Sequence, residues 1–137
     1  MSKKFISKED RLRQVPLFSK IGKKHLAAIA RISDIVEVPT GEVFVVEGGI
    51  GDQFIMILEG QAKVERNGKV IGQLSENDFF GEIALIGHRP RTATVTADTD
   101  MRVLAVDRGH FHELLEEAPE LWKEIAIALC HYIRPKE

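Results

Sequence analysis

A glycine, an acid and an arginine at fixed spacing are the residues of this chain best suited to bind a charged ligand. Gly81 ends an extended run and opens a short helical turn, predicted over about Ile83–Ile86, while Glu82 sits at that turn and Arg91 follows nine residues later. The start of a helical turn presents unpaired N–H groups to an anion, and a guanidinium adds a two-pronged contact to phosphate oxygens. A carboxylate beside a phosphate is repulsive unless the ligand also carries a donor. The triplet therefore predicts a site for a sugar that carries a cyclic phosphate.

The sequence around this triplet resembles a known binding motif. The strings F-G-E-I-A-L at 80–85 and P-R-T-A-T-V at 90–95 resemble the phosphate-binding cassette of cyclic nucleotide-binding domains. That family includes catabolite-activator-type regulators, regulatory subunits of cyclic-nucleotide-dependent kinases and cyclic-nucleotide-gated channels. The resemblance covers roughly residues 12–134, since the family pattern is also matched by Pro16-Leu17-Phe18, Gly41, Glu47-Gly48, Gly60 and the run from Phe111 to Pro119.

The resemblance implies a role for each residue of the cassette. Arg91 would bind the cyclic phosphate, Glu82 would accept a hydrogen bond from the ribose 2′-hydroxyl, and backbone N–H groups of the turn would complete the phosphate site. Thr92 is compatible with both cAMP and cGMP, and we expect cAMP. The expected ligand-binding residues are Phe80, Gly81, Glu82, Ile83, Ala84, Arg91, Thr92 and Ala93 in the cassette, with Val64, Ile71 and Leu74 against the base and sugar.

The elements that must position these residues follow from the hydrophobic pattern. Residues 8–33 have helical spacing broken at Pro16, and residues 34–107 are short β-branched runs separated by turn residues, including an Asn67-Gly68 hairpin signal. This pattern predicts an α+β, mainly β fold: a jelly-roll-like antiparallel β-barrel flanked by N-terminal helices and two C-terminal helices within 108–134. The residues expected to fill the barrel interior are Phe54, Met56, Leu58, Ala62 and Val64.

The overall composition is that of an ordinary globular chain. With 137 residues, 44% hydrophobic and 29% charged, the chain is expected to form a single domain spanning residues 1–137, with the cassette at 80–93. The net charge of −2 gives no basic field for nucleic acid, and no helix-turn-helix is expected after the final helix, so we expect no direct DNA binding. The single cysteine, and the absence of a signal peptide or a membrane-spanning run, favour the cytoplasm.

Two other functions remain open at this point. A cupin-type enzyme would share the jelly roll, but the histidines fall mainly in predicted helices and loops, so we expect no enzyme, no metal and no cofactor. A ligand-free interaction module of the same fold would act through the final helix. The apolar stripe of that helix, from Leu121 to Ile133, is expected first to pack on the barrel, and it also suits a homodimer contact or a lid over the base. The expected partners are the nucleotide and an effector protein or domain that the sequence does not identify.

Overall fold

Short helices lead the chain into the barrel. The computed structural model describes residues 7–87 and 89–132. Its first elements are α1 (Lys8–Leu12), the 3₁₀ helix η1 (Pro16–Phe18) and α2 (Lys23–Ile32). The Ser7 hydroxyl caps α1 by accepting a hydrogen bond from the Asp10 N–H, and Pro16 occupies the first position of η1, where its missing N–H costs nothing. The predicted helical segment and its break at Pro16 are confirmed, although Ser33 already belongs to the first strand.

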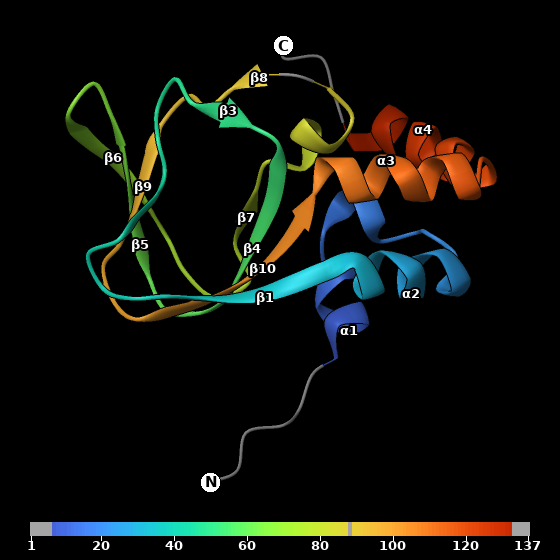
Figure 1. Ribbon diagram of the computed structural model, residues 1–137, viewed down its shortest axis with the longest axis horizontal. Helices are drawn as coiled ribbons and strands as arrows, with labels where there is room; N and C mark the ends of the chain where they lie inside the picture. The colour runs from blue at the N-terminus through green and yellow to red at the C-terminus, as the bar shows by residue number, and fades with distance from the viewer. Residues whose placement is uncertain (1–6, 88, 133–137) are drawn as a thin grey trace, which may run out of the picture.

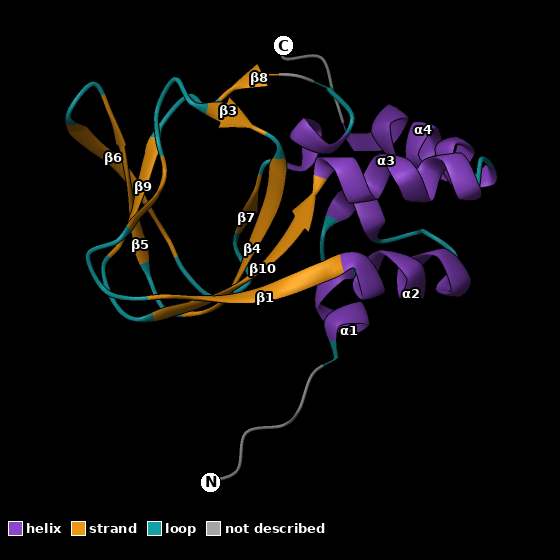
Figure 2. Cartoon of the chain, in the orientation of Figure 1, coloured by secondary structure: helices purple, strands orange, loops and turns teal. Residues whose placement is uncertain are grey.

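The described strands form two four-stranded antiparallel sheets and a two-stranded ribbon, which together make the barrel in Figures 1 and 2. One sheet has the order β1 (Ser33–Val38), β10 (Met101–Asp107), β4 (Gln53–Glu59) and β7 (Phe79–Phe80). The second has the order β2 (Val43–Val45), β9 (Thr94–Ala97), β5 (Ala62–Arg66) and β6 (Lys69–Leu74). The ribbon pairs β3 (Ile50–Gly51) with β8 (Arg89–Pro90), which places the end of the cassette beside the β2–β4 connection.

The β5–β6 hairpin turns where the sequence predicts it. Asn67 and Gly68 have φ angles of 53° and 79°. Two successive residues with positive φ are the signature of the tight turn that matches the twist of a hairpin. This turn brings β6 back beside β5, so that Ile71 and Leu74 return to the neighbourhood of Val64.

The strand β4 is buried on both faces, and its residues divide the hydrophobic interior into two clusters. Phe54, Met56 and Leu58 pack against the helices in a cluster that we call the helical core. Ile55 and Ile57 point the other way, into a second cluster that we call the barrel interior. The prediction that Phe54, Met56 and Leu58 fill the barrel is therefore wrong. A run of consecutive apolar residues carries no alternation to show which face is which.

Two helices that follow the barrel pack beside the N-terminal ones (Figure 1). These are α3 (Arg108–Glu117), as predicted, and α4 (Glu120–Tyr132). The side chain of His25 in α2 lies between two carboxylates of α4, with Nδ1 3.0 Å from Glu124 and Nε2 3.3 Å from Glu120. This cluster fastens α4 to α2. The part of the predicted final helix that falls on residues 133–134 lies outside the described residues.

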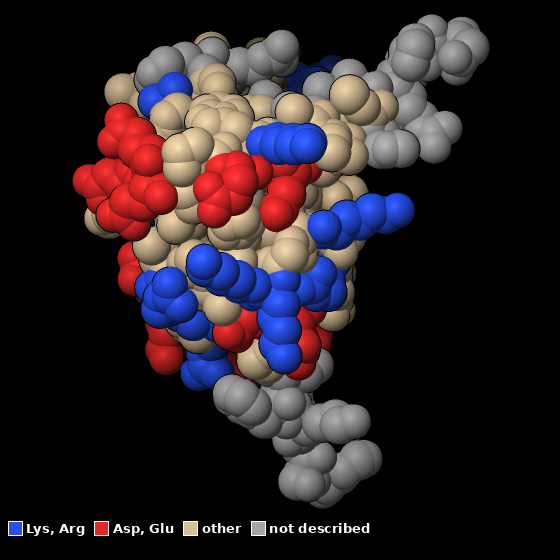
Figure 3. Space-filling model, turned by 90° about the vertical axis from the view of Figure 1, so that its right-hand side faces the viewer, with Lys and Arg blue, Asp and Glu red and all other residues tan. Residues whose placement is uncertain are grey.

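The helical end of the molecule carries both signs of charge. In Figure 3 acidic side chains gather in the upper half of this face and basic ones in the lower half. Neither sign covers the whole face, in keeping with the net charge of −2. No helix in the described part of the chain is long and apolar enough to cross a membrane.

Candidate functional site

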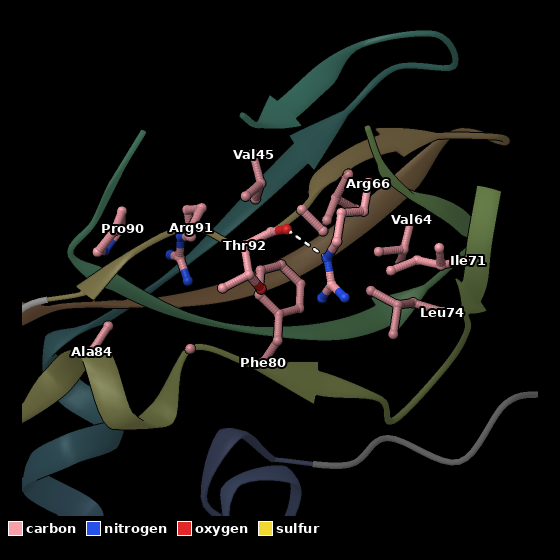
Figure 4. A pocket seen from close by; sticks show the side chains of 13 residues that line it. Val45, Val64, Arg66, Ile71, Leu74, Phe80, Ala84, Pro90, Arg91 and Thr92 are labelled. Carbon is pink, nitrogen blue, oxygen red and sulfur yellow. Dashed lines mark hydrogen bonds between the residues drawn. The ribbon is translucent and has the colours of Figure 1, made fainter. Parts of the chain in front are cut away.

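A cavity of about 320 Å³ opens between the second sheet and the cassette (Figure 4). Figure 4 shows Ala84, Pro90 and Arg91 at one end of it and Val64, Arg66, Ile71 and Leu74 at the other. Phe80 and Thr92 lie between the two ends. Gly81, Ala93, Val45 and Val95 complete the lining. The cavity thus has a polar end at Arg91 and a largely apolar end at the β5–β6 hairpin.

Most of the residues expected to bind a ligand meet in this cavity. The exceptions are Glu82 and Ile83, which do not belong to its lining. Both lie in the 3₁₀ helix η2 (Glu82–Leu85), one residue earlier than the turn predicted from the sequence. The Ile83 side chain lies outside the described part of the structure. The Glu82 side chain is buried, and this burial raises the pKa of its carboxyl, an effect that a hydrogen bond from its own backbone N–H opposes.

The guanidinium of Arg91 is held in place before any ligand binds. Its Nη2 donates to the Gln53 carbonyl at 2.6 Å, and the group lies 5.6 Å from the centre of the Phe80 ring, within cation–π range. Burial lowers the pKa of Arg91, and the negative charge of Asp52 acts in the opposite direction. An arginine keeps its charge in proteins. The cavity therefore contains a fixed, half-buried positive charge at one end.

Gly81 is the residue that lets this arginine approach the cassette backbone. Its φ is +84°, a conformation that side chains other than glycine rarely adopt. A Cβ at this position would stand 2.5 Å from the Gln53 carbonyl oxygen and 2.7 Å from Nη1 of Arg91. The missing Cβ therefore makes room for the guanidinium of Arg91 beside the cassette backbone.

Arg66 is the polar lining residue that the sequence argument missed. It lies on β5, and its Nε donates to the Thr92 carbonyl at 2.9 Å. A signal was available, because Arg66 is two residues beyond Val64, so strand alternation places both on one face. The lining residues Val45, Pro90 and Val95 were also missed; Val45 and Val95 are buried residues of the barrel interior, which the pattern of apolar residues alone does not separate from core.

The loop between β2 and β3 fixes the backbone on either side of Arg91. The Gly48 N–H donates to the Arg91 carbonyl at 2.8 Å, and the Arg91 N–H donates to the Gly49 carbonyl at 2.9 Å. The same loop reaches the hairpin, since the Glu47 carboxylate accepts a hydrogen bond from the Asn67 N–H at 3.1 Å. The β2–β3 loop thus forms hydrogen bonds both with the backbone of Arg91 and with the β5–β6 hairpin.

A histidine connects η2 to the C-terminal helices. Nε2 of His112 in α3 donates to the carbonyl of Leu85, the last residue of η2, at 2.8 Å. The His112 ring also stands edge-on to Trp122 of α4, with ring centres 6.3 Å apart. Within η2 itself, Ala84 lines the cavity while Leu85 is buried in the helical core. The hydrogen bond and the ring contact of His112 thus join η2 to α3 and α4.

Metal chemistry has no evident site in the described part of the chain. No group of three or more His, Cys, Asp or Glu side chains there is arranged to hold a metal ion. The cavity is instead lined mostly by apolar side chains, with the guanidinium of Arg91 at one end.

A family model of the cyclic nucleotide-binding domain matches residues 35–118, which include the whole cassette. The chain belongs to this family. It is 37% identical over 116 residues to a cAMP-dependent protein kinase regulatory subunit of Schizosaccharomyces pombe, covering 84% of this chain and 28% of that protein. The chain thus spans less than a third of the length of this relative.

Solved structures of other proteins have the same fold as this chain. The N-terminal domain of a transcriptional regulator from Streptomyces coelicolor A3(2) superposes with a TM-score of 0.81 at 28% identity, covering 90% of this chain and 91% of that one. The cAMP-bound PfPKA-R superposes with a TM-score of 0.66 at 27% identity, covering 90% of this chain and 45% of that one. The predicted fold class and family are both confirmed.

Proposed function

We propose that this domain binds a 3′,5′-cyclic nucleotide, with cAMP preferred, in the cavity between the cassette and the β5–β6 hairpin. The observation that carries the proposal is the guanidinium of Arg91, half-buried, oriented by Gln53 and Phe80, and facing a cavity that is otherwise mostly apolar. A fixed cation suits one phosphate, and the apolar end suits a purine.

The individual contacts follow from this placement. The cyclic phosphate lies against Arg91 and the N–H groups at the start of η2, and the ribose faces Glu82. The Glu82 carboxylate must gain access to the cavity as the sugar enters, and a hydroxyl donor would then offset the cost of its burial. Phe80 and Thr92 line the middle of the cavity, Ala93 also belongs to its lining, and Val64, Ile71 and Leu74 pack against the base.

The preference for cAMP is supported by two proteins that this chain resembles. One is named as a cAMP-dependent kinase regulatory subunit, and the other is a cAMP-bound structure of the same fold. The exposed Thr92 side chain lines the cavity and suits either base, so cGMP is the second candidate. Binding is the whole activity in this proposal, with no catalytic step and no cofactor.

We further propose that binding is relayed through the C-terminal helices. The hydrogen bond from His112 to Leu85 and its ring contact with Trp122 form a physical connection from η2 to α4. A ligand that shifts η2 would bias the packing of α3 and α4, and so alter the surface offered to an effector. That surface includes the exposed Trp122, which also suits a contact between two copies of the chain. The cytoplasm remains the expected location.

Calorimetric titration with cAMP and with cGMP tests the binding site. We expect micromolar or tighter binding, weakened by about ten- to a hundredfold in Arg91→Ala, because a charge-assisted contact is worth about 1.5–3 kcal/mol. The control is Arg102→Ala, which removes an exposed arginine of β10 that pairs with Glu37 and Glu59 and does not line the cavity. Equal affinities in wild type and Arg91→Ala would contradict the site. No binding by the wild type would favour the interaction module.

Hydrogen exchange tests the relay separately from binding. At saturating nucleotide, protection in α3 and α4 and the emission of Trp122 should change. If both stay the same while calorimetry shows binding, the domain binds the nucleotide but does not signal through these helices.

A further inference from the structure

Arg66 is a second arginine in the cavity, at the opposite end from Arg91. It lies just before the Asn67-Gly68 turn, and Figure 4 shows its guanidinium between Thr92 and Leu74. Its Nε donates a hydrogen bond to the Thr92 carbonyl at 2.9 Å. Among the residues that the structure describes, no carboxylate lies within ion-pair distance of it. The two terminal nitrogens are therefore available to a ligand.

The proposed orientation of the nucleotide brings its base to this end. A cyclic nucleotide carries one anionic group, and Arg91 provides the fixed cation beside η2. The sugar and base must then extend along the cavity toward Val64, Ile71 and Leu74. Arg66 stands among these apolar side chains, so it faces the base rather than the phosphate.

The chemistry of a guanidinium distinguishes the two purines. It offers only donors, in a planar fork. Guanine presents two acceptors on one edge, N7 and O6, whereas adenine presents the acceptor N7 beside the amino donor at N6. With Nε fixed on Thr92, the remaining N–H groups can pair with a 6-oxo purine but meet a donor on adenine.

We propose that Arg66 is a specificity-determining residue that reads position 6 of the purine and favours 6-oxo cyclic nucleotides over cAMP. This rests on the proposed function and concerns a ratio of affinities. The cavity as a whole can still bind cAMP more tightly than cGMP. In that case Arg66 makes the difference between the two affinities smaller. A purely structural role, holding Thr92 through its carbonyl, would change the affinity for every nucleotide alike.

The test is titration of wild type, Arg66→Met and Arg66→Lys with cAMP, cGMP and the cyclic nucleotide of hypoxanthine, cIMP. Methionine keeps an apolar stem without donors, and lysine keeps the charge without the fork. In Arg66→Met we expect cGMP and cIMP to weaken by about tenfold or more, as for loss of a two-pronged base contact, while cAMP changes less than about threefold. Arg66→Lys should recover only part of the loss.

The matched control is Lys69→Met, because Lys69 pairs with Arg66 across the hairpin but does not line the cavity. It removes the same charge and should leave the ratio unchanged. Equal weakening of all three nucleotides in Arg66→Met, or no change in any, would overturn the assignment of Arg66 while leaving the binding site in place. Absence of binding by the wild type would overturn the proposed function and this inference together.

Discussion

The two faces of β4 differ in how completely they are filled. On the helical side, Phe54 is fully buried and its ring meets Phe18 edge-on, with centres 5.7 Å apart, while Phe18 also contacts Phe111. On the barrel side, Ile55 and Ile57 lie in a mostly aliphatic cluster, against which the partly buried Phe44 and Phe80 pack. There the interior is continuous with the cavity, because Val45 and Val95 belong to both. One strand thus supports a closed core on one face and an open cavity on the other.

From this difference we expect stability and ligand binding to depend on different side chains of neighbouring elements. The same strand joins them, since the carbonyl of Gln53 at its start orients Arg91 while the next residue, Phe54, lies in the helical core. The helix η2 also contributes to both regions, because Ala84 lines the cavity and Leu85 lies in the helical core. Substitutions on the two faces should therefore have separable effects.

The largest effect is expected on the closed face. Phe54→Ala should lower the free energy of unfolding by about 3–5 kcal/mol, because it removes a fully buried ring and leaves a cavity. Val64→Ala, at a half-buried position that already borders open space, should cost only about 1 kcal/mol while weakening nucleotide binding. Urea unfolding of both variants measures the difference. Similar losses of stability would mean that the barrel side is packed as tightly as the helical side.

The same contrast explains what could be predicted from the sequence. The Asn67-Gly68 turn, the break at Pro16 and the segment Arg108–Glu117 carry local signals that act within a few residues. No local signal shows which side chains of β4 point into the barrel, because an unbroken apolar run fits either orientation. Strand alternation could have placed Arg66 on the same face as Val64, but its contact with Thr92 appears only when β5 lies beside the residue after Arg91. That proximity comes from pairing of β5 with β9, which are far apart in the sequence.

A smaller effect is expected at the junction of the two faces. Gly81→Ala should destabilise the fold by more than about 1 kcal/mol and displace Arg91, because it combines an unfavourable φ with a methyl group too close to the Gln53 carbonyl and the guanidinium. Gly68→Ala is a matched control: its φ is +79°, and an added Cβ would meet nothing within 4 Å. Unfolding and calorimetry should show a loss of nucleotide affinity in Gly81→Ala alone. Equal behaviour of the two variants would assign the cost to backbone conformation only.

The smallest effect is expected from the buried acid of the cassette. Because burial raises the pKa of Glu82, the folded state keeps this proton to higher pH than the unfolded state does. The free energy of unfolding then falls as pH rises from the ordinary value of 4.5 through the raised pKa, and the loss is complete above it. Glu82→Gln removes the titration, so its stability relative to wild type should grow with pH, while its affinity for the nucleotide should drop.

Urea unfolding of the nucleotide-free protein between pH 4 and 8 measures this difference. Glu116→Gln, on the exposed side of α3, makes the same change in net charge and serves as the control. A difference between Glu82→Gln and wild type that stays constant with pH would show that the carboxylate is already satisfied in the free protein. The open face of β4 would then carry no electrostatic cost for a ligand to relieve, and the contrast with the closed face would reduce to packing alone.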